Sequence, residues 1–251
     1  MKIIFINIII LISFCFSKET LGLVTKSKGK VEYQKYDSNK FTSSVKRGLG
    51  LYGDDQIRTG DNGFSMYRYL DDASSIKILK NSEVIIQGRI DSRNITKNVE
   101  VTNGLLNFNI DQQNDGYFTV VTPTSVATVK GTEFWLICNG VEGDKFLGVE
   151  GSVEVKNIES GQKVILNENS TVVSTSNGNI VTQTMTTEDF QQVDELEDES
   201  GEYEDFDVDT DTGYNDDSDI DSNTESNELN IIRIEFEDSL GNSKEIIVKY
   251  K

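Results

Sequence analysis

The chain has 251 residues, with 43 Asp and Glu, 24 Lys and Arg and no His, so its formal net charge is −19. Residues 188–228 hold 19 acidic side chains and no basic one, so this segment carries the whole excess and the rest of the chain is neutral. A neutral body offers no patch that attracts phosphates, which argues against nucleic-acid binding. The absence of His excludes catalytic triads and zinc sites built on imidazole.

The first 17 residues have the parts of a secretory signal peptide. Lys2 supplies a positive start, residues 3–12 are apolar apart from Asn7, and the small residues Cys15 and Ser17 suit a cleavage after Ser17. The apolar run is shorter than the roughly 20 residues that a transmembrane helix needs. We therefore expect a periplasmic, cell-surface or secreted protein with no membrane span after cleavage. A retained anchor and a lipid-modified Cys15 are the alternatives.

Residues 18–184 are predicted to form a single compact all-β domain of short hairpin-linked strands, of the sandwich or barrel-like type. Alternation of apolar and polar residues predicts strands at 31–33, 64–70, 75–79, 83–87, 117–121 and 133–138. Tight turns are predicted at the four dipeptides Asn103-Gly104, Asp115-Gly116, Asn139-Gly140 and Asn177-Gly178. The one proline, Pro123, falls between two predicted strands, where a missing amide donor costs least.

The last of these predicted strands is apolar on both faces. Phe134 and Cys138 face one side and Trp135 and Ile137 face the other, which predicts a strand covered on both sides. Cys138 is the only cysteine after signal cleavage, so no internal disulfide is expected. In this apolar run we interpret it as a buried, inert thiol and not as a nucleophile.

Two parts of the body resemble the FecR domain, which is known from the periplasmic part of ferric-citrate-type iron sensors. The first part spans residues 51–74 and carries the motif residues Gly53, Asp54, Thr59, Gly60 and Gly63. The second spans residues 122–153 and carries Pro123, Gly131, Thr132, Phe134 and Gly151. The resemblance covers roughly residues 22–175. It implies an all-β periplasmic or cell-surface interaction domain without catalytic residues.

The sequence departs from the family pattern in two ways. Asp72 stands where the family usually has the glycine of an Asp-Gly-Ser turn. Iron-sensing members also place a cytoplasmic segment that binds a sigma factor, and a membrane helix, ahead of this domain, whereas here an export signal is expected. The regulatory function is therefore not transferred.

Several side chains of the body are candidate site residues. Gly131 and Glu133 are interpreted as parts of a bend into a strand, and Arg58 and Lys130 as solvated charges at strand ends in preference to anion ligands. A pair of carboxylates can hydrolyse glycans, and five candidates are Asp54, Asp55, Asp61, Asp71 and Asp72. All lie in turn-like stretches, where Asp commonly caps its own backbone, so we do not expect an enzyme.

Residues 185–228 are predicted to be an acidic, disordered linker. The weak calcium candidates in it are Asp207, Asp209, Asp211, Asp217, Asp219 and Asp221. An EF-hand is excluded because Thr212 and Ser218 stand where Gly and Glu are required, so low-affinity calcium is the one cofactor considered. A short helix capped by Thr187 is predicted at its start, with Phe190, Val193 and Leu196 on one face.

Residues 229–251 are predicted to form a β-hairpin in which Phe236 faces Ile246 and Ile234 faces Val248. An isolated hairpin is marginally stable in water, so we expect it to dock. Together these features predict an exported, non-catalytic binding module of the cell envelope. Its β-body is expected to recognise a protein or a cell-wall polysaccharide. The alternatives are a structural component that adds its C-terminal hairpin to a partner's sheet, and a carboxylate-based hydrolase.

Overall fold

The computed structural model describes residues 18–43, 45–91, 94–113, 116–204, 230–237 and 243–250. The chain divides into two units, Met1–Asp207 and Val208–Lys251. No helix in the described ranges is both long enough and apolar enough to cross a membrane.

The described part of the first unit is almost entirely β-structure, which confirms the predicted all-β class. Its strands are β1 (Gly22–Lys28), β2 (Val31–Gln34), β3 (Gly50–Leu51), β4 (Asp55–Thr59), β5 (Phe64–Tyr69), β6 (Ser75–Ile78), β7 (Glu83–Asp91), β8 (Asn94–Ile110), β9 (Phe118–Val121), β10 (Ser125–Cys138), β11 (Asp144–Asn157), β12 (Lys163–Asn167), β13 (Ser170–Ser174) and β14 (Ile180–Thr184). A short 3-10 turn, η1 (Gly140–Glu142), joins β10 to β11, and one helix, α1 (Thr187–Glu204), follows β14.

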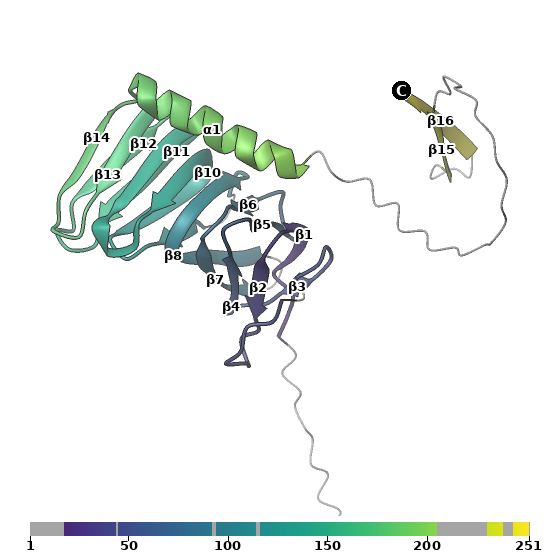
Figure 1. Cartoon of the computed structure of the whole chain (residues 1–251), viewed down its shortest axis with the longest axis horizontal. Coiled ribbons are helices and arrows are strands. Elements are labelled where there is room, and N and C mark those ends of the chain that lie inside the picture. The colour runs from purple at the N-terminus through teal and green to yellow at the C-terminus, as the bar shows by residue number, and fades with distance from the viewer. Residues whose placement is uncertain are drawn as a thin grey trace, which may run out of the picture. The chain divides into compact units, whose positions relative to one another are not determined.

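These fourteen strands form one sheet in the order β14-β13-β11-β10-β9-β8-β6-β5-β1-β3. β12 pairs with β11, and β2, β4 and β7 form a branch that joins β8. All neighbours are antiparallel except β8 and β9, which are parallel. Figure 1 shows β10 to β14 side by side in one part of the unit and β1 to β7 in the other.

The longest strands bend, which allows the single sheet to fold over one core. β11 pairs with β13 through its first half and with β12 through its second half, and the β10–β11 register shifts between Val129 and Thr132. A β-bulge of this kind bends a strand and increases its twist. The inward side chains on both sides of the bend, such as Val129 and Phe134, belong to one buried cluster.

Aromatic rings fill the middle of this core. The Phe108 and Phe134 rings stack with their centroids 5.1 Å apart, and Phe118 lies edge-on to Phe108 and Tyr69. All four side chains are almost completely buried. Each such ring stabilises the fold by about 1.5–3 kcal/mol relative to an exposed position.

The predicted turn at Asn103-Gly104 is wrong. Both residues lie inside β8, whose first part pairs with β7 and whose last part pairs with β6 and β10. A residue with a side chain is excluded at Gly104, since its φ is 128° and a Cβ there would lie 2.2 Å from Ser82 Oγ. The glycine therefore permits a close strand crossing, not a turn. Asn139-Gly140 and Asn177-Gly178 do fall in the β10–β11 and β13–β14 connections.

The first part of the predicted disordered linker is the 18-residue helix α1. Thr186, one residue earlier than expected, caps it: Asp189 N donates to Thr186 Oγ1 (3.2 Å) and Thr186 N donates to Asp189 Oδ2 (2.9 Å). This reciprocal pair is a capping box. The predicted apolar face is also partly wrong, because Leu196 is buried whereas Phe190 is 44% exposed.

The second unit, taken by itself, contains the hairpin of β15 (Asn230–Glu237) and β16 (Ser243–Tyr250). Ile234 pairs with Ile246 and Phe236 with Lys244, so the register differs by two residues from the predicted one. The six calcium candidates between residues 207 and 221 lie outside the described residues.

Candidate functional site

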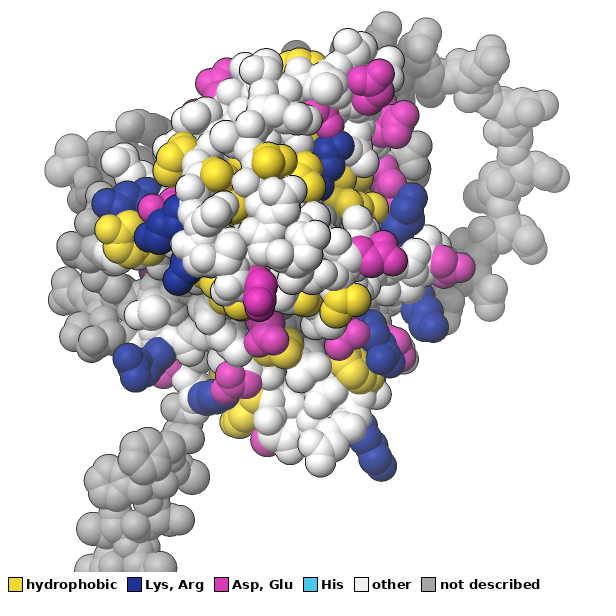
Figure 2. All heavy atoms as spheres, turned by 90° about the vertical axis from the view of Figure 1, so that its left-hand side faces the viewer, with side chains coloured by type: hydrophobic (Ala, Val, Ile, Leu, Met, Phe, Trp, Pro, Cys, Tyr) yellow, Lys and Arg dark blue, Asp and Glu magenta, His cyan; other side chains and the backbone are white. Residues whose placement is uncertain are grey.

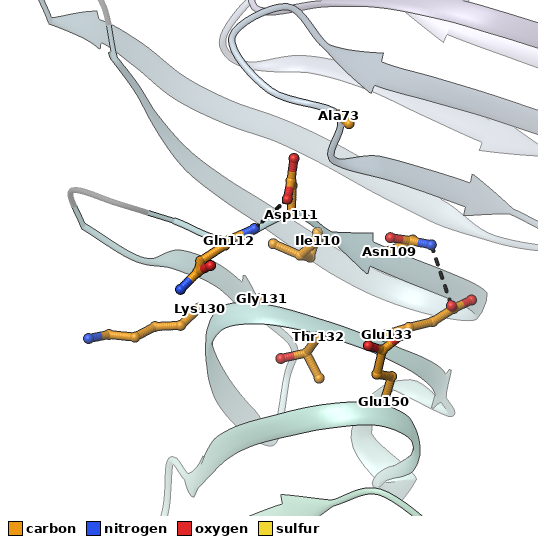
Figure 3. Close-up of a pocket in the computed structure, with 10 residues that line it drawn as sticks. All are labelled: Ala73, Asn109, Ile110, Asp111, Gln112, Lys130, Gly131, Thr132, Glu133 and Glu150. Carbon is orange, nitrogen blue, oxygen red and sulfur yellow. Dashed lines mark hydrogen bonds between the residues drawn. The ribbon is translucent and has the colours of Figure 1, made fainter.

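The outer face of the sheet, turned away from the core, is hollowed where β10 and β11 bend (Figure 3). The hollow has a volume of about 520 Å³ and lies between the end of β8, the bend of β10 and the adjoining part of β11. Its polar lining residues include Asn109, Asp111, Lys130, Thr132, Glu133 and Glu150. We call this hollow the bend groove.

Glycines make the bend possible. A Cβ on Gly131 would lie 3.1 Å from Gln112 Cα, and one on Gly151, whose φ is 76°, would lie 2.7 Å from the Gly131 carbonyl oxygen. Thr132 Oγ1 donates to the Ser152 carbonyl oxygen (3.0 Å) and so ties β10 to β11 at this point. Phe134, the last residue of the motif, points into the core. These motif residues therefore shape the groove and do not act as chemical groups in it.

Two glutamates lie side by side on adjacent strands of the groove (Figure 3). Glu133 and Glu150 are directly paired residues of β10 and β11. Glu133 accepts hydrogen bonds from Asn107 Nδ2 (3.1 Å) and Asn109 Nδ2 (3.4 Å), which hold its carboxylate in place, whereas Glu150 is exposed. Sequence reasoning missed this pair because 17 positions separate the two residues and only the strand register brings them together.

A second hollow of about 560 Å³ continues the groove along the outer face. It is lined by Tyr117, Thr119, Thr128, Lys130, Ser152, Glu154 and Ile165. Thr128 pairs with Thr119 on one side and with Glu154 on the other, so a row of polar side chains crosses three strands. Lys130 lines both hollows, and its Nζ lies 4.8 Å from the centre of the exposed Tyr117 ring. We call the two hollows together the outer strip.

The composition of the outer strip defines what it can do chemically. Hydroxyl, amide and carboxylate groups on strands of a rigid sheet can form several hydrogen bonds to one ligand. Figure 2 shows Lys and Arg interspersed with Asp and Glu on the face that it presents, without an extended patch of one sign. No cluster of three metal-ligating side chains occurs in the described ranges.

The motif residues of the first FecR-like part lie at turns and close approaches. Thr59 Oγ1 donates to the Leu79 carbonyl oxygen (2.5 Å) and accepts from Ser82 N (2.9 Å). A Cβ on Gly53 would lie 2.7 Å from the Gly88 carbonyl oxygen, and those of Gly60 and Gly63 would collide with Lys30. Asp54 has a positive φ of 71° in the turn before β4.

Pro123 is exposed in the β9–β10 connection, as the sequence predicts. The flanking hydroxyls of Thr122 and Thr124 both donate to Asp144 Oδ2 and fasten this turn to the start of β11.

Most of the carboxylates considered for catalysis already have partners inside the protein. Asp55 accepts hydrogen bonds from Tyr52 N (2.8 Å), Tyr36 N (2.9 Å) and the Tyr33 hydroxyl (2.7 Å). Asp54 pairs with Lys18 (3.0 Å). These contacts make the turn carboxylates structural, as the sequence indicates.

Asp71 and Asp72 pair with a buried lysine that sequence reasoning missed. Lys97 is 2% exposed, and its Nζ lies 2.9 Å from Asp71 Oδ2 and also contacts Asp72 Oδ2. Burial would raise the pKa of Asp72, but hydrogen bonds from Lys97, Gln113 and Ser74 outweigh it and hold that pKa below its usual value. Lys97 lies two positions before the buried Val99 and so falls in the same alternating set of inward-facing residues of β8. This alternation is the sequence signal that could have identified Lys97 as buried.

The remaining candidates also have structural roles. Arg58 pairs with Glu32 (2.8 Å) and lies 4.0 Å from the centre of the Phe41 ring. Cys138 is 3% exposed, and burial, with a smaller contribution from Asp144, raises the pKa of its thiol to about 12. A thiol with this pKa is protonated at neutral pH and unreactive.

The fold and the outer strip define the class of protein: an all-β domain built on one bent sheet, with an open polar face. More specifically, residues 55–154 are a FecR domain, because the family model described as FecR protein matches them. This match confirms the resemblance read from the two motif-bearing parts.

Two solved structures are similar to part of the chain, and both are described as a "putative anti-sigma factor" from Parabacteroides distasonis. One, at 2.50 Å resolution, has 19% identity and a TM-score of 0.44, and the other, at 1.65 Å, has 20% identity and a TM-score of 0.43. Each match covers 53% of this chain and 61% of the other, so this chain spans less than two thirds of their length. No curated protein matches it significantly.

Proposed function

We propose that this protein is an exported, non-catalytic binding module of the bacterial cell envelope that recognises a protein or a cell-wall polysaccharide through the outer strip. One observation carries the proposal: two adjoining hollows form an open polar face on a sheet whose motif residues serve to bend it. The FecR domain supports a regulatory or interaction role. The signal-like first 17 residues support a place in the periplasm or at the cell surface.

The chemistry of the outer strip suits recognition. Its hydroxyl and carboxylate groups sit on hydrogen-bonded strands, so the backbone that carries them is already ordered and no loop has to be ordered on binding. Exposed Tyr117 and Ile165 add apolar surface at its rim. Ligand sites typically combine such apolar area with a few well-placed polar groups.

Affinity capture tests this proposal. The chain from residue 18 onwards is immobilised and incubated separately with envelope protein extract and with purified cell-wall polysaccharide. A variant with Lys130→Ala and Thr128→Ala should lose the captured component, whereas Glu159→Ala, an exposed change outside the strip, should retain it. Binding through the strip would be contradicted if the two variants captured equal amounts of the component. It would also be contradicted if the parent protein and both variants captured nothing.

A second candidate, a carboxylate-based hydrolase, is favoured by one observation, the pair Glu133 and Glu150 in the open bend groove. Directly paired residues on adjacent strands have Cβ atoms about 4.5–5.5 Å apart, and glycosidases use carboxyl groups about 5–9.5 Å apart. Release of reducing ends from cell-wall polysaccharide, abolished by Glu133→Gln, would establish this activity. Binding without release would exclude it in favour of the first proposal.

A further inference from the structure

A separate apolar surface lies on the outer face beneath α1, apart from the outer strip. Its sheet side consists of Phe64, Leu79, Trp135, Ile137 and Leu147, which we call the outer cluster. Four of these side chains are completely buried and Ile137 is 8% exposed. In Figure 1, α1 runs across β10 to β14, and within the described chain it is the element that covers this cluster.

The helix contributes little apolar surface of its own. Leu196 is 6% exposed and Val193 is partly buried against the cluster, whereas Phe190 points to solvent. The other well-buried helix residues are polar, namely Asp189 and Ser200. The apolar face of five large side chains is therefore covered by two aliphatic residues of α1 together with Met185, which lies just before the helix and is 8% exposed.

The charge of α1 disfavours the helix by itself. Its 18 residues include nine Asp and Glu and no Lys or Arg. Like charges four positions apart, such as Asp194 with Asp198 and Asp198 with Glu202, destabilise a helix, and carboxylates in its last turn oppose the macrodipole. Gly201 costs about 1 kcal/mol more. The helix therefore depends on the sheet beneath it.

Two lysines of the sheet side hold α1 by its ends. Lys145 Nζ lies 2.6 Å from Asp189 Oδ1, and Lys80 Nζ lies 2.9 Å from Glu199 Oε2. The two acids are ten positions apart, which corresponds to about 15 Å along a helix. A positive charge thus contacts α1 near each of its ends, with a spacing that fits carboxylates nearly three turns apart on a helix.

The covered region also contains polar atoms that α1 does not satisfy. Trp135 Nε1 and Asn107 Oδ1 are buried and have no hydrogen-bond partner among the described residues. Trp135 and Asn107 are directly paired on β10 and β8. Each unpaired buried group costs about 1–3 kcal/mol. A different occupant with hydrogen-bonding side chains at this point would recover that energy.

From these contacts we propose that α1 is a displaceable cover and that the outer cluster is a docking surface for an amphipathic helix of a partner protein. The partner helix carries two carboxylates that reach Lys80 and Lys145, apolar residues at the positions of Val193 and Leu196, and fewer like charges than α1. It displaces α1 because it makes the same contacts without the same self-repulsion. The proposal does not depend on what the outer strip binds.

A synthetic helix provides the probe. The peptide has the sequence of residues 187–204 with four acids replaced, D194Q, E195Q, D198Q and E202Q, so that the two carboxylates that contact lysines remain. Binding is measured by anisotropy of the labelled peptide and by emission of Trp135, the single tryptophan of the chain.

The matched variants are Leu196→Asp, which replaces the buried contact of α1, and Phe190→Asp, which changes an exposed position of the same helix. The proposal predicts that Trp135 emission shifts to the red in Leu196→Asp. It also predicts that Leu196→Asp binds the peptide at least tenfold more tightly than Phe190→Asp does. The peptide with the unaltered sequence should bind Leu196→Asp more weakly than the neutralised one.

Amide hydrogen exchange of the unaltered chain keeps the test decisive if Leu196→Asp unfolds the whole domain. The proposal requires α1 amides to exchange at least tenfold faster than those of β10, through a local opening. Exchange of α1 and β10 at one common rate, or a folded Leu196→Asp variant with unshifted emission and no peptide binding, would overturn it.

Discussion

Replacing Lys97 by Met tests whether the buried charge cluster of Lys97, Asp71 and Asp72 stabilises the fold. Met fills a similar volume and removes the cation. The Asp71 and Asp72 side chains are each only 17% exposed, so their carboxylates would remain close together, little solvated and without a counter-charge. Gln113, whose Oε1 accepts from Lys97 Nζ (3.2 Å), would also lose a donor.

The expected loss is large. Removing one partner of a buried ion pair costs about 3–5 kcal/mol, and a domain typically has only about 5–15 kcal/mol of stability. The matched control is Lys163→Met, because Lys163 pairs with Glu154 (2.8 Å) at the surface, where the side chains are 55% and 40% exposed. Exposed pairs contribute less than about 1 kcal/mol, so this control should be nearly neutral.

Urea unfolding followed by Trp135 fluorescence measures both effects. With a slope of about 2 kcal/mol per M, Lys97→Met should lower the midpoint by about 1.5–2.5 M. Adding Asp71→Asn and Asp72→Asn to Lys97→Met should restore much of the loss, since the unpaired charges are then gone. A midpoint for Lys97→Met within 0.5 M of the parent (about 1 kcal/mol at that slope), or a triple variant no more stable than the single one, would refute this reasoning.

Three further predictions concern α1, the bend and the thiol. Burial opposes ionisation of Asp189, but contacts with Lys145, Thr186 and Thr171 lower its pKa to about 2. The ionised carboxylate therefore contributes about 2 kcal/mol of stability above pH 4, and this contribution is lost as the pH falls to 2. The unfolding free energy of Asp189→Asn should lack this pH-dependent part. Gly151→Ala should destabilise the fold by at least 1 kcal/mol more than Gly161→Ala in urea melts, because both have positive φ but only Gly151 would make a steric collision. In a Cys15→Ser background, Cys138 should react with a thiol reagent only after unfolding, and labelling of the folded protein at pH 8 would show that the thiol is accessible.

The FecR domain and its motif residues are recognisable from the sequence alone because turn glycines and strand starts are local features. The positive φ of Gly151 and the bend at Gly131 follow from short-range geometry that single residues encode. The bend groove was not predictable, because Glu133, Glu150 and Asn109 meet only through the register of three strands. The same reason explains the wrong turn at Asn103-Gly104: the glycine is needed for a crossing with Ser82, which no local pattern reveals.

The helix α1 shows the limit of reasoning from composition. Its capping residue and apolar spacing predict a short helix at its start, but its acidic residues predict an extended chain after that, and the structure extends the helix to Glu204. The sequence did show that Trp135 and Ile137 need a cover on the second face of their strand. It did not show that the acidic segment supplies that cover.

The sequence by itself therefore determined the all-β class, the FecR domain, the inert thiol and the presence of a strand with two apolar faces, because these depend on side-chain alternation and on turn residues close in the chain. The tertiary structure alone decided how the sheet bends into one core, which carboxylates meet in the bend groove and that Lys97 lies inside. It also decided that the short helix predicted at residue 187 continues to Glu204, since burial against Trp135 and ion pairs with Lys80 and Lys145 offset a repulsion that the isolated segment cannot overcome.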